Sequence, residues 1–377
     1  MTGGAVRHLY VHLPFCASRC GYCDFVIVVG RGGQHRAYVD ALLAELELER
    51  GVLAPRLETV FLGGGTPTFT DPSDLRRLLA ALPSAAEVTV EANPETVTPE
   101  LARLLREAGV TRISLGAQSF RQQLLQVLER RAGPDDVRRA FYHLRDASFD
   151  NISIDLLHGI PGQSASDLEL DIDEALALAP EHISYYELEA KPGTRFTHAH
   201  GAELARQAEA MEGYFESVIE RLTVAGYRWY ETANFCLAHA RANGRDLRAR
   251  HNLAYWLGRD YLGLGIGAVS TLGAQRRRNT PRLNGYIAAL EGGAPPAREL
   301  EELDASVRAL ERVMLGLRLD EGLPFSVAEG ALDHRALDRL ERLGLATRRA
   351  GEHGPEALVL TPRGRRLGGA VTAELLA

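Results

Sequence analysis

The chain has 377 residues and a formal net charge of −7, with 45% hydrophobic and 25% charged residues. The negative charge argues against general nucleic-acid binding, and the composition is ordinary for a soluble globular protein. No apolar run reaches the ~20 residues that a membrane span needs, which leaves only peripheral membrane contact open. Clustered free cysteines without matching partners fit a reducing compartment, so we expect a cytoplasmic protein.

Strands and helices are expected to alternate six times in the first half of the chain. The hydrophobic pattern predicts strands at residues 7–13, 59–62, 88–91, 112–116, 152–157 and 182–188. Helices are predicted at residues 37–48, 75–82, 100–108 and 167–178, and two helical segments broken at Gly133-Pro134 precede the fifth strand. This alternation with short connections means a parallel sheet with right-handed crossovers. The fold class is therefore α/β, and in a barrel of this kind the active site lies at the carboxyl ends of the strands.

The second part of the chain has a different character. A long helix is predicted at residues 204–225, an aromatic strand at 227–234 and a glycine-rich run at 263–270. Helices at 303–316 and 334–343 precede a ribbon of residues 346–349 and 357–360, and this order resembles a winged helix. We predict three parts, residues 1–200, 201–298 and 299–377. Because the chain is acidic, we expect the winged-helix-like part to pack or to bind a partner, not DNA.

Three of the four cysteines lie in one short stretch, Cys16, Cys20 and Cys23, with the spacing C-x3-C-x2-C. Three thiolates from a tight loop suit an iron–sulfur cluster or a zinc ion. A structural zinc site needs four protein ligands, and the fourth cysteine, Cys236, is far away in sequence. Three sulfurs leave one iron of a [4Fe-4S] cluster open to a small molecule. We therefore expect a cluster, with Cys236 as a buried or incidental thiol.

The cysteine spacing, followed by Phe25, resembles the radical S-adenosylmethionine (SAM) superfamily. In that superfamily the open iron binds the amino and carboxylate groups of SAM, and electron transfer cleaves SAM to a 5′-deoxyadenosyl radical. The six-fold alternation matches the partial (β/α)6 barrel of these proteins. The resemblance implies that Tyr22 lies near the adenine, and that Gly64, Gly65 and Thr66, after the second strand, contact the SAM amino group.

Polar residues end three successive strands, at Glu91, Gln118 and Asp155. Polar groups at neighbouring strand ends can converge on one ligand, and carboxylates suit ribose hydroxyls. Arg130, one helix after Gln118, can meet the SAM carboxylate in a fork. As a set these residues match those that surround bound SAM in the HemN-like subfamily. The same resemblance adds Tyr10, ahead of the cysteines, and, more loosely, Val269 as an apolar adenine contact.

Within the subfamily the resemblance points to haem chaperones, not to oxygen-independent coproporphyrinogen dehydrogenases. The dehydrogenases carry a further cysteine two residues past the third cluster cysteine, where this chain has Phe25. They also have a longer arm ahead of the first strand. The chain matches a haem-linked H-N-x-x-Y-W motif of the chaperones at His251, Asn252, Tyr255 and Trp256. Neutral imidazole is a good axial ligand for haem iron, so we expect His251 to bind haem and the two aromatic rings to stack or pack.

The expected function is therefore the binding of haem and its delivery to apo-haemoproteins, with a [4Fe-4S] cluster, SAM and haem as cofactors. A porphyrinogen-oxidising enzyme and a HemN-like radical SAM methyltransferase are the alternatives. Two positions depart from the subfamily pattern, because Val269 stands where a histidine is usual and Ala132 where one is frequent. These departures weaken any catalytic role for the two positions.

Overall fold

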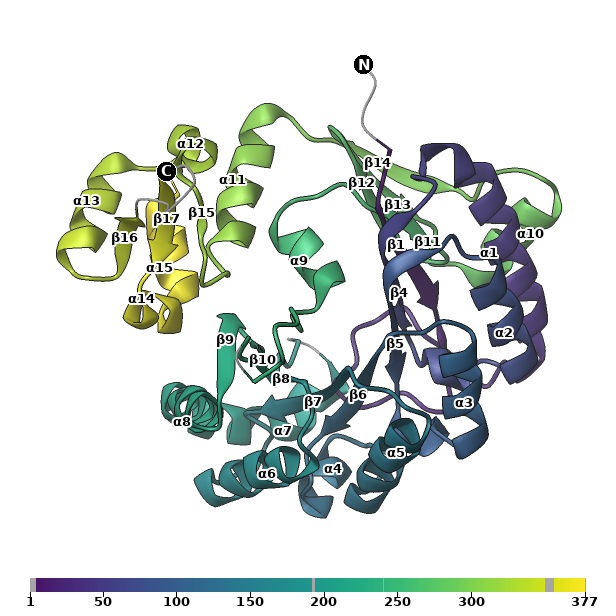
Figure 1. The fold of residues 1–377 in the computed structure, drawn as a ribbon, viewed down its shortest axis with the longest axis horizontal. Helices are drawn as coiled ribbons and strands as arrows, with labels where there is room; N and C mark the ends of the chain where they lie inside the picture. Colours follow the sequence, from purple (N-terminus) through teal and green to yellow (C-terminus); the bar gives the residue numbers. More distant parts are fainter. Residues whose placement is uncertain (1–4, 192–193, 240, 350–355, 377) are drawn as a thin grey trace.

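The computed structural model describes residues 5–191, 194–239, 241–349 and 356–376 (Figure 1). Its largest element is a nine-stranded sheet with the strand order β11-β1-β4-β5-β6-β7-β8-β10-β9. The strands from β11 to β8 are parallel, and β10 pairs antiparallel with both β8 and β9. The strands are β1 (His8–Leu13), β4 (Leu57–Gly64), β5 (Ala85–Ala92), β6 (Arg112–Gln118), β7 (Ile152–His158), β8 (His182–Glu187), β9 (Tyr227–Glu231), β10 (Asn234–Leu237) and β11 (Leu262–Leu264). The α/β class and the six successive parallel strands are confirmed.

Helices cover the convex face of this curved sheet (Figure 1). They are α1 (His35–Glu49), α2 (Pro72–Ala81), α3 (Pro99–Glu107), α4 (Gln122–Val127), α5 (Pro134–Asp146) and α6 (Ala165–Leu178). Local sequence explains their bounds, as α3 illustrates. The Thr98 side chain accepts a hydrogen bond from the Leu101 amide, and Pro99 fills the first helical position. The face of α3 with Leu101 and Leu105 is buried against the sheet.

The two faces of the parallel strands carry different residues. On β1, Leu9 and Val11 belong to the apolar core under the helices, so His8 and His12 face the other way. Many inward positions of the next strands are also polar: Thr59, Glu87, Thr89, Glu91, Arg112, Ser114, Ser153, Asp155, His182 and Ser184. A parallel sheet is usually apolar on both faces. A polar inner face therefore marks the concave side as the functional side.

The open side of the partial barrel, between β9 and β11, is occupied by the short helix α9 (Arg250–Trp256) (Figure 1). This helix packs on β4, where the ring of His251 stacks on Phe61 with centroids 5.1 Å apart. The imidazole of the H-N-x-x-Y-W motif therefore lies inside the barrel, against β4.

The predicted single helix over residues 204–225 is wrong. The structure has α7 (Arg195–Gln207) and α8 (Met211–Val224), separated by a 3-10 turn at Ala208–Ala210. The chain is held on both sides of that turn by one loop. Gln207 donates to the carbonyl oxygen of Gln163, and the hydroxyl of Tyr214 donates to the same oxygen. These two anchors fix the direction of each helix.

The predicted strand over residues 227–234 also differs, because the chain reverses after Glu231 and forms the β9–β10 hairpin. The Glu231 carboxylate accepts hydrogen bonds from the amide of Ala233 and from Nδ2 of Asn234, which closes the turn. The glycine-rich run then forms β11, and β12 (Val269–Leu272), β13 (Gln275–Asn279) and β14 (Arg298–Glu302) form a small sheet, with α10 (Leu283–Glu291) between its last two strands.

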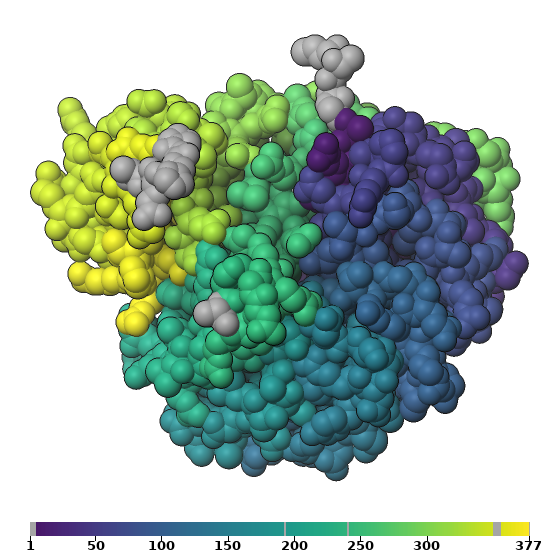
Figure 2. Space-filling model, viewed as in Figure 1, coloured from purple at the N-terminus to yellow at the C-terminus, as the bar shows by residue number. Residues whose placement is uncertain are grey.

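The last part of the chain has its own apolar core, which includes Val313, Leu337 and Leu358. Its elements are α11 (Ala305–Gly316), β15 (Leu323–Pro324), α12 (Phe325–Ala328), α13 (His334–Arg342), β16 (Ala346–Arg349), β17 (Ala357–Leu360), α14 (Pro362–Arg366) and α15 (Gly368–Leu375). The predicted ribbon corresponds to β16 and β17. Figure 2 shows this part in yellow, packed against green and teal residues of the main body. Among the described residues, no helix combines the length and the apolar character that a membrane span requires.

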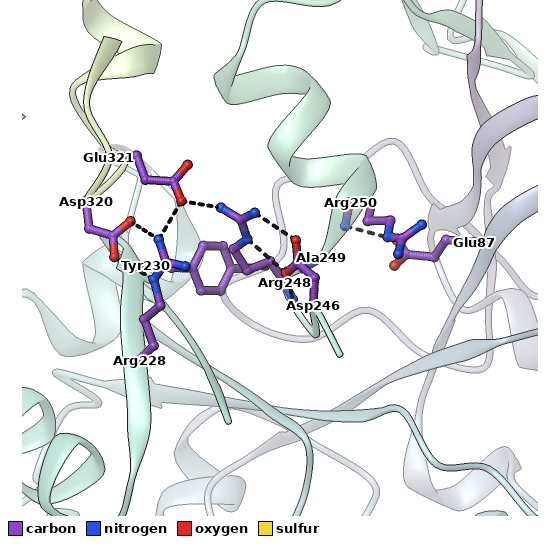
Figure 3. A network of polar contacts seen from close by, with 9 residues as sticks. All are labelled: Glu87, Arg228, Tyr230, Asp246, Arg248, Ala249, Arg250, Asp320 and Glu321. Carbon is purple, nitrogen blue, oxygen red and sulfur yellow. Dashed lines mark hydrogen bonds and ion pairs between the residues drawn. The ribbon is translucent and has the colours of Figure 1, made fainter. Parts of the chain in front are cut away.

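Salt bridges join the C-terminal part to the β9–β10 region. Arg228 on β9 contacts both Asp320 and Glu321, and Arg248 contacts Glu321 (Figure 3). The guanidinium of Arg365 lies 3.6 Å from the centre of the Trp229 ring. The three-part division of the chain stays a prediction, and the main sheet crosses its first boundary, since β9, β10 and β11 come from residues 201–298.

Candidate functional site

The cysteine loop leaves the carboxyl end of β1. Residues Phe15–Cys16 (β2) pair in parallel with Val28–Val29 (β3), and this small ladder closes the loop that carries the thiols. Cys16 is buried, whereas Cys20 and Cys23 are half-buried. The loop therefore rests at one end on the protein core, and its other two thiols are partly exposed.

Two of the thiols have polar neighbours, one at the end of β4 and one between α4 and α5. Cys16 Sγ lies 3.5 Å from the hydroxyl of Thr66, and Arg130 places a guanidinium nitrogen 3.8 Å from Cys20 Sγ. Arg130 also donates to the Gly116 carbonyl and to Asn93 Oδ1, while its Nε has no partner among the described residues.

The donor set fits an iron–sulfur cluster. No group of three or more His, Cys, Asp or Glu side chains within the described ranges is arranged to hold a single metal ion. In a [4Fe-4S] cluster each thiolate binds a separate iron, so such a cluster needs no single point of convergence. Burial raises the pKa of the Cys16 and Cys23 thiols, and a bound metal deprotonates a thiol outright.

The glycine run after β4 lies directly on the cysteine loop. The Gly65 amide donates to the Leu13 carbonyl, and the Thr66 amide donates to the Phe15 carbonyl. A Cβ atom on Gly65 would lie 2.4 Å from the Pro14 carbonyl oxygen and 3.0 Å from Cys16 Sγ. Only glycine permits this approach.

Glu91 and Gln118 end their strands as predicted. Glu91 accepts a hydrogen bond of 3.0 Å from the Gly64 amide, and burial raises the pKa of its carboxyl to about 7. Gln118 has the left-handed backbone angle φ of 67°, at an irregularity of the β6–β7 pairing. Gly116 leaves room for its amide, since a Cβ there would lie 3.0 Å from Gln118 Nε2. Such an irregularity re-aims a side chain at a strand end.

Asp155 is held at both carboxylate oxygens. The Ser114 hydroxyl donates to one oxygen at 2.7 Å, and the Ser153 hydroxyl donates to the other at 2.9 Å. Its position on β7 places it beside β6 on the concave face. Two donors leave a carboxylate with lone pairs free to accept from a ligand.

Tyr10, Tyr22 and Val269 lie in three different surroundings. The Tyr10 hydroxyl contacts His12 Nδ1 at 3.0 Å, and burial raises the pKa of that phenol. Tyr22 packs on a separate apolar cluster that includes Phe196. Val269 is half-buried at the start of β12, next to Gly263, which pairs with Tyr10. Val269 therefore lies beside β11, the strand that neighbours Tyr10.

The motif residues of α9 are engaged within the protein. The His251 side chain is 1% exposed, and its Nδ1 contacts the Thr59 hydroxyl at 2.7 Å while its Nε2 contacts the Tyr255 hydroxyl at 2.9 Å. Burial lowers the pKa of His251 to about 3, so the imidazole is neutral. Trp256 is half-buried under the guanidinium of Arg318, and Asn252 is half-buried on the same helix.

Sequence reasoning missed several polar residues of the concave face, which are Asn93, His12, Ser114, Ser153 and His182. Asn93 links two predicted site residues, because its amide donates to Thr66 and accepts from Arg130. The signal was present, since polar residues alternate with apolar ones in strands whose connections predict a parallel sheet. Local patterns cannot say which of these side chains meet.

Comparisons with known proteins identify a superfamily, a set of relatives and a fold. Residues 10–175 match the radical SAM superfamily. The chain is 36% identical, over 98% of its length and 94% of the relative, to the heme chaperone HemW of Mycobacterium tuberculosis (strain ATCC 25618 / H37Rv). It is 33% identical, over 98% of its length and 99% of the relative, to the heme chaperone HemW of Bacillus subtilis (strain 168). The structure is similar to coproporphyrinogen III oxidase (HemN) from Escherichia coli, with a TM-score of 0.77 and 22% identity over 98% of this chain and 90% of that one, a likeness that concerns the fold.

Proposed function

This chain belongs to the HemW family of the radical SAM superfamily, and from that premise we propose that it binds haem and delivers it to apo-haemoproteins. Membership of the superfamily implies a [4Fe-4S] cluster and SAM. One observation carries the proposal. The cysteine loop, the polar strand ends and the motif helix α9 all border the same barrel interior.

In this proposal Cys16, Cys20 and Cys23 hold the cluster, and Arg130 balances the charge of the Cys20 thiolate. The bound cluster and SAM supply one-electron chemistry. The residues of the chain orient the ligand. The backbone of Gly64 and Gly65 comes close to it, and the proposed contacts around it are Tyr10, Tyr22, Thr66, Glu91, Gln118, Arg130, Asp155 and Val269.

Electrostatics supports a ribose site between Glu91 and Asp155. The Asp155 carboxylate is one of the groups that raise the pKa of Glu91, after burial, so the two carboxylates are close enough to repel each other. Hydroxyl donors placed between them would relieve that repulsion and satisfy both. Replacing Asp155 with Asn should therefore weaken SAM binding, and calorimetry with the reconstituted protein measures the loss.

We propose His251, Asn252, Tyr255 and Trp256 as the haem contacts, with His251 Nε2 as the axial ligand. The hydrogen bonds around the ring support this choice of atom. The Glu58 carboxylate 3.8 Å from His8 Nε2 favours the proton on that nitrogen, so His8 Nδ1 accepts from the Thr59 hydroxyl. Thr59 then accepts from His251 Nδ1, which leaves the Nε2 lone pair directed toward Tyr255. A hydrogen-bond acceptor on Nδ1 is typical of histidines that bind metals through Nε2.

The Tyr255 hydroxyl and the haem iron then compete for His251 Nε2. Iron can reach Nε2 only after Tyr255 gives up its hydrogen bond of 2.9 Å, and the buried ring must become accessible. Tyr255→Phe should therefore bind haem more tightly than the parent by about tenfold, the size of one hydrogen bond. His251→Ala should alter the Soret band or abolish binding. Equal spectra and affinities for parent and His251→Ala would return His251 to a structural role.

A haem titration tests the function itself, with parallel assays for porphyrinogen oxidation and for methyl transfer. We expect haem binding near one equivalent, and transfer of that haem to an added apo-haemoprotein. The absence of a further cysteine at Phe25 supports this function over that of the dehydrogenase. Oxidation or methylation without haem binding would establish one of the two enzyme alternatives instead.

The free thiols of the cluster loop support a reducing compartment, so we place the protein in the cytoplasm. We further propose that the recipients are apo-haemoproteins of that compartment. The C-terminal part is joined to the barrel by the salt bridges of Arg228 and Arg248.

A further inference from the structure

Behind Asp155, a chain of buried hydrogen bonds runs through the barrel wall to the start of α9. We propose that His182 is a positioning residue, which holds Asp155 for its ligand through Ser153 and holds the start of α9 through Tyr230. The first half of this inference rests on the proposed role of Asp155 in SAM binding. The second half concerns only the protein itself.

The four contacts have a single consistent direction. Ser153 has one hydroxyl proton, and it is donated to Asp155 Oδ1 at 2.9 Å. The contact of 2.8 Å between Ser153 Oγ and His182 Nδ1 therefore requires that the imidazole donate.

Burial lowers the pKa of His182 well below its ordinary value, so the ring is neutral and Nε2 carries no proton. Nε2 must then accept, at 2.8 Å, from the hydroxyl of Tyr230. The Tyr230 oxygen accepts in turn from the Ala249 amide at 3.2 Å.

Each donor in this chain points toward the carboxylate. Hydrogen bonds in series polarise one another, and the effect is strongest where water is excluded. The side chains of Ser153, His182 and Tyr230 are fully buried. The negative charge of Asp155 therefore fixes the tautomer of His182, and His182 fixes the Ser153 hydroxyl that orients Asp155.

At its other end the hydrogen-bond series supplies a cap for α9 that the local sequence lacks. Ala249 precedes α9 and has no side-chain cap, and the first amides of a helix have no partners within it. The Tyr230 hydroxyl accepts from Ala249, and Glu87 accepts from the Arg250 amide at 3.0 Å (Figure 3). The backbone of Tyr230 also accepts from Asp320, which belongs to the C-terminal part.

Two conservative substitutions of His182 separate the two halves of the inference. Asparagine places its amide nitrogen near the position of Nδ1 and keeps the donor to Ser153. Glutamine reaches the position of Nε2 and keeps a partner for Tyr230. The test measures SAM affinity by calorimetry on reconstituted protein, and amide hydrogen exchange of residues 246–256 in the absence of SAM.

We expect His182→Gln to weaken SAM binding about tenfold with α9 exchange near that of the parent. We expect His182→Asn to bind SAM within about threefold of the parent and to exchange faster at the start of α9. Tyr230→Phe should also accelerate that exchange. The matched control is Tyr227→Phe on the same strand. The Tyr227 hydroxyl donates to the Pro180 carbonyl and takes no part in the hydrogen-bond series of His182. Equal iron content confirms that each variant has kept the cluster loop.

The outcomes are distinguishable. If His182→Asn and His182→Gln lose SAM affinity alike, the loss reflects packing and the positioning role is wrong. If Asp155→Asn weakens SAM binding but His182→Gln does not, the inference fails while the proposed SAM site stands. If Asp155→Asn binds SAM as the parent does, the SAM site and the first half of the inference both fail. Unchanged α9 exchange in Tyr230→Phe overturns the second half.

Discussion

Glu91 should make SAM binding depend on pH in a way that identifies this residue. Burial, and then the charge of Asp155, raise the pKa of its carboxyl from 4.5 to about 7, against the opposing effect of the Gly64 amide. Ribose hydroxyls that donate to the carboxylate would favour its charged form, so its pKa in the complex falls. Binding therefore releases a proton wherever free Glu91 is protonated.

The size of the effect follows from the pKa. At pH 6, one unit below the pKa of about 7, only about a tenth of the carboxyl is ionised, and at pH 8 about nine tenths is. SAM should therefore bind about tenfold more tightly at pH 8 than at pH 6, a difference of ~1.4 kcal/mol.

Calorimetry at both pH values, in buffers with different ionisation enthalpies, measures the affinity and the proton release together. The control is Glu91→Gln, which cannot titrate, and the ionisation of SAM itself is common to both proteins. The difference between parent and Glu91→Gln should carry the tenfold pH dependence. If that difference is flat or of opposite sign, either Glu91 does not contact SAM or its pKa is not raised.

Folding stability gives a second check that needs no SAM. A carboxyl whose pKa is raised by folding contributes stability below its unfolded value of 4.5, and this contribution is lost as the pH rises through 7. The full rise in pKa corresponds to at most ~3 kcal/mol, and partial exposure of the side chain reduces it. Glu91→Gln should thus be more stable than the parent at pH 8 and similar to it at pH 5. A variant that is less stable at pH 8 contradicts the raised pKa.

Three further outcomes test the cluster, the glycine run and the buried charges. Cys16→Ser should strongly reduce the iron bound on anaerobic reconstitution from about four per chain, while Cys236→Ser should not, and equal losses would refute the three-thiolate site. Gly64→Ala should lower the melting temperature and the SAM affinity, at a cost of about 1–3 kcal/mol. The reason is that φ of Gly64 is 114° and the added Cβ would lie 2.5 Å from a ring carbon of His12. Melting temperature and affinity equal to those of the parent would show that the strand end adapts. Arg298→Met should cost about 1–3 kcal/mol, because it removes the cation beside the fully buried Glu45, while Tyr286, Asn279 and the Gly265 amide still donate to that carboxylate. Adding Glu45→Gln should recover much of that loss, and a single variant as stable as the parent would contradict the pairing.

Local sequence was sufficient for the cluster loop and for the order of the main elements. Cys16, Cys20 and Cys23 lie within one loop, so their spacing alone brings the thiols together. The alternation of strand and helix predicts the parallel sheet, because short right-handed crossovers leave few other arrangements. The ends of parallel strands share one edge, which is why the sequence alone could predict that Glu91 and Asp155 lie near each other.

Tertiary structure decided what each polar side chain does. His251 meets Thr59 across 192 residues, and Glu45 binds the Gly265 amide across 220. Such contacts depend on the curvature of the sheet and on where α9 enters it, and neither leaves a periodic signal in the sequence. The helix break at residues 208–210 had the same origin, since the anchors on Gln163 override local helix propensity. His182 reads as an ordinary strand residue in the sequence, and only the folded barrel places its two nitrogens between Asp155 and α9, because a neutral imidazole can donate on one side and accept on the other.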